Sequence, residues 1–147
     1  MNDFSKRKAP WHLWAVGIIS LLWNAGGAFD YLMTKLQAQS YLEQFTQEQL
    51  DFFFGFPQWV NATWAIAVWF SVLGSVYLLL RRRAAVPIFW ISLLAMMATA
   101  LHNFVLADVT MWDIMGRGAA VFTLVIFVVA LLLVVYSRWL RVNRILV

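Results

Sequence analysis

Four long apolar stretches constrain this chain more than any other feature. They cover about residues 11–33, 57–80, 84–106 and 118–137. About 20 helical residues cross a hydrocarbon layer of about 30 Å, and a helix satisfies its own backbone hydrogen bonds in lipid. The sequence therefore predicts an all-α, integral membrane four-helix bundle in which residues 1–147 form a single transmembrane domain.

The composition is typical of a chain surrounded by lipid. Of the 147 residues, 63% are hydrophobic and only 12% are charged, whereas soluble domains carry about 25% charged residues. The formal net charge of +4 comes from basic residues at the ends of the spans. It therefore predicts an orientation in the lipid bilayer and no nucleic-acid partner.

Catalysis has no support in the sequence. The chain contains no cysteine, which excludes disulfides, thiolate metal sites and cysteine nucleophiles. It contains no G-x-S-x-G, no H-E-x-x-H, no glycine-rich phosphate loop and no close pair of carboxylates within a span. We therefore expect a protein that is not an enzyme and that holds no metal.

Basic residues divide unevenly between the two sides of the predicted membrane. With four crossings, both chain ends lie on the same side as the connection between the second and third spans. Nine of the eleven Lys and Arg residues are on that side, which the positive-inside rule makes cytoplasmic. The other side holds six of the seven acidic residues. The nine basic residues are Lys6, Arg7, Lys8, Arg81, Arg82, Arg83, Arg138, Arg141 and Arg144.

The outer connection between the first and second spans is the most polar part of the chain. Residues 35–39 are expected to extend the first helix. Thr46 and Gln49 have the spacing of a capping box, which satisfies free N–H groups at a helix start, and Gly55 suits a helix end. These signals predict a short amphipathic helix that lies at the outer membrane surface or covers the bundle.

Small and weakly polar side chains recur at helical spacing within the spans. Such rows allow two helices to approach closely in lipid, so we expect them to face neighbouring helices. The rows are Ser20, Asn24 and Ala28; Trp23, Gly27, Asp30 and Thr34; Ala67, Ser71 and Ser75; and Ala95, Thr99 and Asn103.

Polar side chains at membrane depth concentrate in the outer half of the predicted bundle. Such residues are costly in lipid and are candidates for function by default. They predict an outward-facing polar site for a small solute, covered by residues 41–56. The alternative for each amide is a plain hydrogen bond to a neighbouring helix, and Arg117 could pair with Asp30 or Asp108. The candidate ligand-binding residues are Asn24, Asp30, Asn61, His102, Asn103 and Arg117.

His102 is the only histidine predicted at depth, because His12 is expected to be solvated near the inner interface. A proton relay, or ligation of heme or a metal, is one interpretation of His102. A histidine hydrogen-bonded to Asn24 or Asn61 is the favoured one, because one histidine supports a cofactor weakly. No cofactor is therefore expected.

Several local sequences taken together resemble an uncharacterised family of small four-span proteins from Gram-negative bacteria. They are Trp11-His12-Leu13-Trp14, residues 22–34, Phe56-Pro57-Gln58-Trp59 and His102-Asn103-Phe104. Members of that family sometimes carry an automatic "sugar transporter" label. The resemblance implies a bacterial inner-membrane location and supplies no catalytic residues.

Two hypotheses about function follow. In the first, the protein binds or transports a small solute through the polar cluster, as a homo-oligomer that supplies a pathway one copy cannot. In the second, it is an accessory or assembly subunit of a larger inner-membrane complex, with the small-residue rows and the fourth span as docking surfaces.

Overall fold

The computed structural model describes residues 8–147, and its regular elements are all helical. Lys6 and Arg7, which the charge analysis places in the cytoplasm, lie outside the described residues. The elements are α1 (Trp11–Lys35), α2 (Gln39–Leu42), α3 (Gln47–Phe54), α4 (Gln58–Leu79), α5 (Ala85–Leu101), the π-helical turn η1 (His102–Leu106) and α6 (Met111–Val142).

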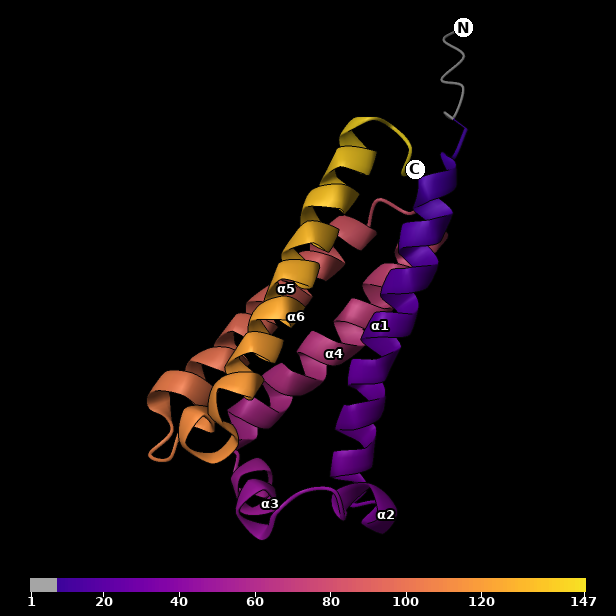
Figure 1. The fold of residues 1–147 in the computed structure, drawn as a ribbon. Coiled ribbons are helices and arrows are strands. Elements are labelled where there is room, and N and C mark those ends of the chain that lie inside the picture. The colour runs from indigo at the N-terminus through magenta and orange to yellow at the C-terminus, as the bar shows by residue number, and fades with distance from the viewer. Residues whose placement is uncertain (1–7) are drawn as a thin grey trace, which may run out of the picture.

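Four of these helical segments are long and apolar enough to cross a membrane: α1, α4, α5 with η1, and α6. They run up and down in turn (Figure 1). The described N-terminal residues and Val147 lie at one end of the bundle, here called the terminal end. The opposite end, here called the connector end, carries α2, α3 and the α5–α6 connection. The predicted all-α membrane bundle is confirmed, and it defines a multi-pass integral membrane protein.

The long helices pack in chain order, with α4 between α1 and α5 and with α6 against α5. The main apolar core lies toward the terminal end, where Leu78, Phe89, Leu93 and Val134 are buried. Helix α6 is the least covered of the four spans. Only 11% of its most apolar window is buried, compared with 22–33% for the other three spans.

The terminal end is closed by the chain after α6. Arg144 has a φ of 59°, which reverses the chain direction. Val147 N–H then donates to Arg81 O at 2.7 Å, and the Arg81 and Arg83 side chains donate to the carbonyls of Ile145 and Leu146. The basic residues that end the second span therefore also fix the tail to the bundle.

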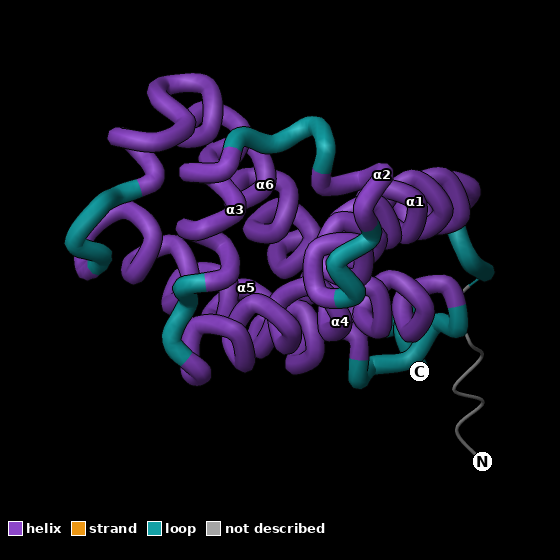
Figure 2. Tube along the Cα trace, turned by 90° about the horizontal axis from the view of Figure 1, so that it is seen from below, coloured by secondary structure: helices purple, strands orange, loops and turns teal. Residues whose placement is uncertain are grey.

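The connector between α1 and α4 contains two short helices rather than one. We expected residues 35–39 to extend the first helix, but α1 ends at Lys35 and Gln37 has a φ of 51°. The four-residue helix α2 follows and lies beside α1, whereas α3 lies beside α6 (Figure 2). The predicted capping box is present, since Thr46 N–H donates to Gln49 Oε1 at 3.0 Å and Gln49 N–H donates to Thr46 Oγ1.

The connection between α5 and α6 is shorter than the sequence indicates. The predicted spans leave residues 107–117 as the connection, but α6 already begins at Met111 behind a Thr110–Asp113 capping box. The helix is interrupted at Gly116, whose φ of 68° and ψ of −162° favour glycine. The predicted start of the fourth span near residue 118 therefore corresponds to a kink within α6.

Small residues bring α1, α4 and α5 close together, both within a predicted row on α1 and at Gly74, which no predicted row includes. On α1, Ser20 and Ala28 are buried. Gly74 on α4 lies against the ring of Phe89 on α5, because a Cβ built on Gly74 would be 2.6 Å from Phe89 Cε1. Since Phe89 is itself buried, its ring has little room to move.

We predict that Gly74→Ala destabilises the protein by about 1–3 kcal/mol, the usual cost of overpacking a filled core. Gly27→Ala is the matched control, because the nearest heavy atom to its Cβ is Val68 Cγ1 at 4.0 Å. Unfolding of both variants in mixed micelles, followed by circular dichroism, measures the difference. Equal stability of the two variants would contradict the proposed close contact.

Candidate functional site

The six predicted ligand-binding residues do not form one cluster. Asn24, Asp30 and Asn61 make three separate contacts. Arg117 is exposed, and His102 and Asn103 lie together. Only His102 lines a cavity, with Asn103 directly behind it. The candidate site is therefore centred on His102, and the other predicted residues make contacts elsewhere or are exposed.

Asn24 ties α1 to α4. Its Nδ2 donates to Ser71 O at 3.1 Å and to Ser75 Oγ at 2.9 Å. Both acceptors belong to the small-residue row predicted on the second span. The alternative that an amide simply bonds to a neighbouring helix therefore describes Asn24, and such bonds contribute about 0.6 kcal/mol on average.

Asp30 and Asn61 hold the α1–α4 connector in place. Asp30 accepts a hydrogen bond from the Tyr41 hydroxyl of α2. Asn61 accepts from Lys35 Nζ and donates to Phe56 O at 3.0 Å. Lys35 also lies 5.3 Å from the centroid of the Trp64 ring, so the end of α1 is attached to the first turns of α4.

Arg117 is exposed on α6, directly after the kink at Gly116. The possible pairing with Asp30 or Asp108 is not formed. Within residues 8–147 no ion pair or hydrogen bond involves its side chain. The non-helical backbone at Gly116 changes the course of α6 just before Arg117, which helical spacing could not reveal.

A cavity of about 520 Å³ opens at the connector end beside His102, and we call it the His102 cavity. Its walls come from the end of α3, the start of α4, the η1 turn and the loop that follows. Its lining residues are Asp51, Phe52, Gly55, Phe56, Pro57, Trp59, His102, Leu106, Ala107, Asp108 and Val109.

Aromatic rings hold the His102 imidazole edge to face. Its ring centroid lies 5.7 Å from that of Phe56 and 5.5 Å from that of Trp59, with interplanar angles of 82° and 84°. Phe52 in turn packs on Phe56 at 5.2 Å. Phe56 and Trp59 lie on either side of Pro57, so the start of α4 contributes two aromatic rings to the cavity wall.

Asn103 fixes the hydrogen-bonding state of His102. Asn103 is buried, and its Oδ1 lies 3.2 Å from His102 Nδ1. An amide oxygen can only accept, so Nδ1 donates in this contact, and in a neutral imidazole the lone pair is then on Nε2. The expected bond from His102 to Asn24 or Asn61 is wrong, because both amides are engaged on α1–α4 contacts. The wider π-helical turn occurs at these residues, as such turns often do at functional sites.

The charges around the His102 cavity are acidic. Asp51 and Asp108 both line it, and its lining includes no lysine and no arginine. Within residues 8–147, no group of three or more His, Cys, Asp or Glu residues is placed to hold a metal ion. The arrangement can therefore hold a small molecule by ring contacts, one imidazole acceptor and two carboxylates.

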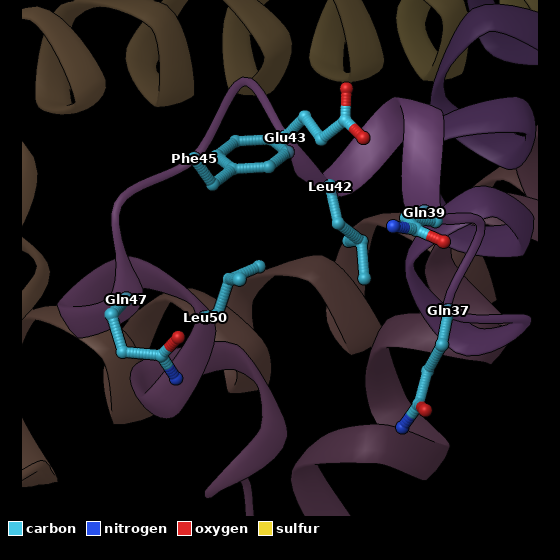
Figure 3. A pocket seen from close by; sticks show the side chains of 7 residues that line it. All are labelled: Gln37, Gln39, Leu42, Glu43, Phe45, Gln47 and Leu50. Carbon is cyan, nitrogen blue, oxygen red and sulfur yellow. The ribbon is translucent and has the colours of Figure 1, made fainter.

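A second, smaller cavity of about 330 Å³ lies between α2 and α3. Leu42, Phe45 and Leu50 form its apolar part, and the side chains of Gln37, Gln39, Glu43 and Gln47 surround it (Figure 3). None of the six predicted residues lines it.

Several contacts were not expected from the sequence. Phe56 and Trp59, at the start of the predicted second span, form walls of the His102 cavity. His12 is not simply solvated, since its Nδ1 is hydrogen-bonded to the Tyr136 hydroxyl and its ring packs on Trp139. The aromatic residues on both sides of Pro57 were the sequence signal for the cavity wall. No local pattern indicated the contacts of His12 with Tyr136 and Trp139.

No family model, curated protein or solved structure matches this chain. The function is therefore argued from the residues and their geometry.

Tyr41 supplies a pH-dependent test of the connector. Burial raises the pKa of Tyr41 to about 12, and the hydrogen bond and charge of Asp30 add to the rise. An unfolded tyrosine has a pKa of about 10. The contribution of the protonated Tyr41 hydroxyl to the free energy of unfolding is therefore fully present below pH 10 and is lost as the pH rises from 10 through 12. The stability difference between the wild type and Tyr41→Phe should shrink toward zero over that range.

The ionisation itself is measured as the difference in absorbance at 295 nm between the wild type and Tyr41→Phe during a pH titration. We expect a midpoint near 12 and a lower midpoint in the Asp30→Asn variant. A wild-type midpoint near 10 would contradict the contact between Tyr41 and Asp30.

Proposed function

We propose that this protein is a non-enzymatic membrane protein that binds a small solute in the His102 cavity. The observation that supports this proposal is the gathering of one imidazole, two carboxylates and several aromatic rings around about 520 Å³ at one end of the bundle. Small-molecule sites are concave, have volumes of about 300–1,000 Å³ and combine apolar walls with a few polar groups.

A role in transport requires more than one copy of the chain. The cavity lies at the connector end, whereas the main core toward the terminal end is packed with Leu78, Phe89 and Val134. A solute that crosses the membrane would need a pathway between copies, so the proposal includes a homo-oligomer.

We infer that the connector end faces the periplasm of a bacterial inner membrane. Seven described basic residues gather at the terminal end, which the positive-inside rule makes cytoplasmic. The resemblance to small four-span bacterial proteins supports the same membrane. The seven residues are Lys8, Arg81, Arg82, Arg83, Arg138, Arg141 and Arg144.

Reporter fusions test this orientation. Alkaline phosphatase, which is active only in the periplasm, should be inactive when fused after Val147 and active when inserted at Gln44 in the connector. Green fluorescent protein at the same two positions should give the reverse result. An active phosphatase after Val147 would contradict the assigned orientation.

A second candidate function is that of an accessory subunit in a larger membrane complex. The observation that favours it is the exposure of α6, of which 11% of the most apolar window is buried. Its exposed residues include Val121, Leu124 and Leu132. A partner helix on this surface would add the packing that α5 alone does not provide.

Filling the His102 cavity tests the solute-binding proposal. Ala107 lines the cavity and its backbone is extended, so Ala107→Phe should place a ring in the cavity without backbone strain. In saturation-transfer difference NMR with small cations, anions and neutral polyols, at least one class should bind the wild type. That signal should fall at least about fivefold in Ala107→Phe, because the added ring occupies the site.

Two control variants accompany this measurement. Ala62→Phe is matched in chemistry and lies at an exposed position outside the cavity lining, so it should leave binding unchanged. Asn24→Leu should lower stability and leave binding unchanged, because Asn24 bonds to α4 away from the cavity. If no class binds in a manner sensitive to Ala107→Phe, solute binding is wrong. Stoichiometric co-purification with another membrane protein in native mass spectrometry would then support the accessory role.

A further inference from the structure

We propose that the solute held in the His102 cavity is a small organic ammonium ion. This inference rests on the proposed function and adds the chemical class of the ligand. Three features of the cavity support it: its aromatic walls, its two carboxylates and the imidazole of His102.

The aromatic walls suit a cation. Phe52, Phe56 and Trp59 line one continuous part of the cavity, with Phe52 against Phe56 and both Phe56 and Trp59 against His102. Aromatic faces attract cations through the ring quadrupole, and groups of such rings recognise quaternary ammonium ligands. Trp59 is 46% exposed, so its ring is available to a solute that enters from the aqueous side.

The charges around the cavity favour the same class. Asp51 and Asp108 are both part of its lining. The nearby basic side chain of Lys35 is occupied by Asn61 and by the Trp64 ring, and Arg117 does not line the cavity. An anion would therefore meet two carboxylates and no opposing cation, which is unfavourable.

In its neutral form, His102 contributes a hydrogen-bond acceptor to the cavity. Asn103 Oδ1 accepts the hydrogen bond from Nδ1–H, so the acceptor is Nε2, which has no hydrogen-bond partner within residues 8–147. A hydroxyl or N–H group on an organic ammonium ion could donate to Nε2 while its charged end lies among the rings and carboxylates. A simple metal ion lacks such a donor and gains little from apolar walls.

Choline and its uncharged isostere 3,3-dimethylbutan-1-ol provide a matched pair of probes, since they have the same shape and hydroxyl group. Binding is measured by saturation-transfer difference NMR and calorimetry on the full chain in a maltoside detergent. Detergents with choline headgroups are avoided because they would occupy the cavity. We expect choline to bind at least about tenfold more tightly than the isostere, because the aromatic and carboxylate terms act only on the cation.

Single substitutions assign the preference to the cavity. Trp59→Leu and Asp108→Asn should each weaken choline binding about threefold or more and should reduce the preference over the isostere. Trp139→Leu and Glu48→Gln are the controls. Trp139 is 47% exposed, close to the value for Trp59, but lies at the terminal end, and neither residue lines the cavity. Both controls should keep wild-type affinity.

The bound ammonium could belong to a free solute or to a lipid headgroup, and nanodiscs distinguish the two. Equal choline affinity in phosphatidylglycerol and phosphatidylethanolamine nanodiscs supports a free solute. Weaker binding in phosphatidylethanolamine supports competition by the headgroup ammonium, which also confirms the ligand class.

Equal affinity for choline and the isostere would overturn the ammonium assignment. So would the binding of another class in a manner sensitive to Ala107→Phe while choline does not bind. In both cases solute binding in the cavity would stand. If Ala107→Phe changes no binding at all, the proposed function itself fails together with this inference.

Discussion

The scarcity of water within a lipid bilayer is the constraint on which this fold depends. Each polar group that enters the hydrocarbon must find a partner inside the protein, because an unsatisfied group costs several kcal/mol there. The long helices satisfy their own backbone groups. In residues 8–147, no buried side-chain nitrogen or oxygen lacks a hydrogen-bond partner. The buried polar side chains are therefore all hydrogen-bonded within the protein.

Several of these hydrogen bonds join one long helix to the next. The bonds of Asn24 to Ser71 and Ser75 join α1 to α4, and the hydroxyl pair of Thr63 and Thr99, 2.8 Å apart, joins α4 to α5. In both cases the polar groups bond to a neighbouring helix, and neither pair lines the His102 cavity. His102 differs, because Asn103 uses only one of its ring nitrogens and the cavity beside it is open to the connector end.

The two ends of the bundle are built differently. At the terminal end, Leu146 is buried and the tail pairs with Arg81 and Arg83, so the apolar core extends almost to the last residue. At the connector end, short helices and rings replace this packing. A cavity can form there because α3 lies against the start of α6 and the loop after η1, while its own last turn leads directly into Pro57 and α4.

The sequence alone determined the number of crossings, the all-helical fold, the close-packed rows such as Ser71 with Ser75, and the capped helix after Thr46. All of these follow from local periodicity, span length and helix-end chemistry, which act within a few residues of the chain. Only the tertiary structure decided that Asn24 is a helix contact, that Arg117 is exposed and that His102 meets Phe56 and Trp59. Those outcomes depend on which faces of distant helices meet, and the kink at Gly116 and the π-turn at His102 rotate side chains away from the positions that regular helical spacing predicts.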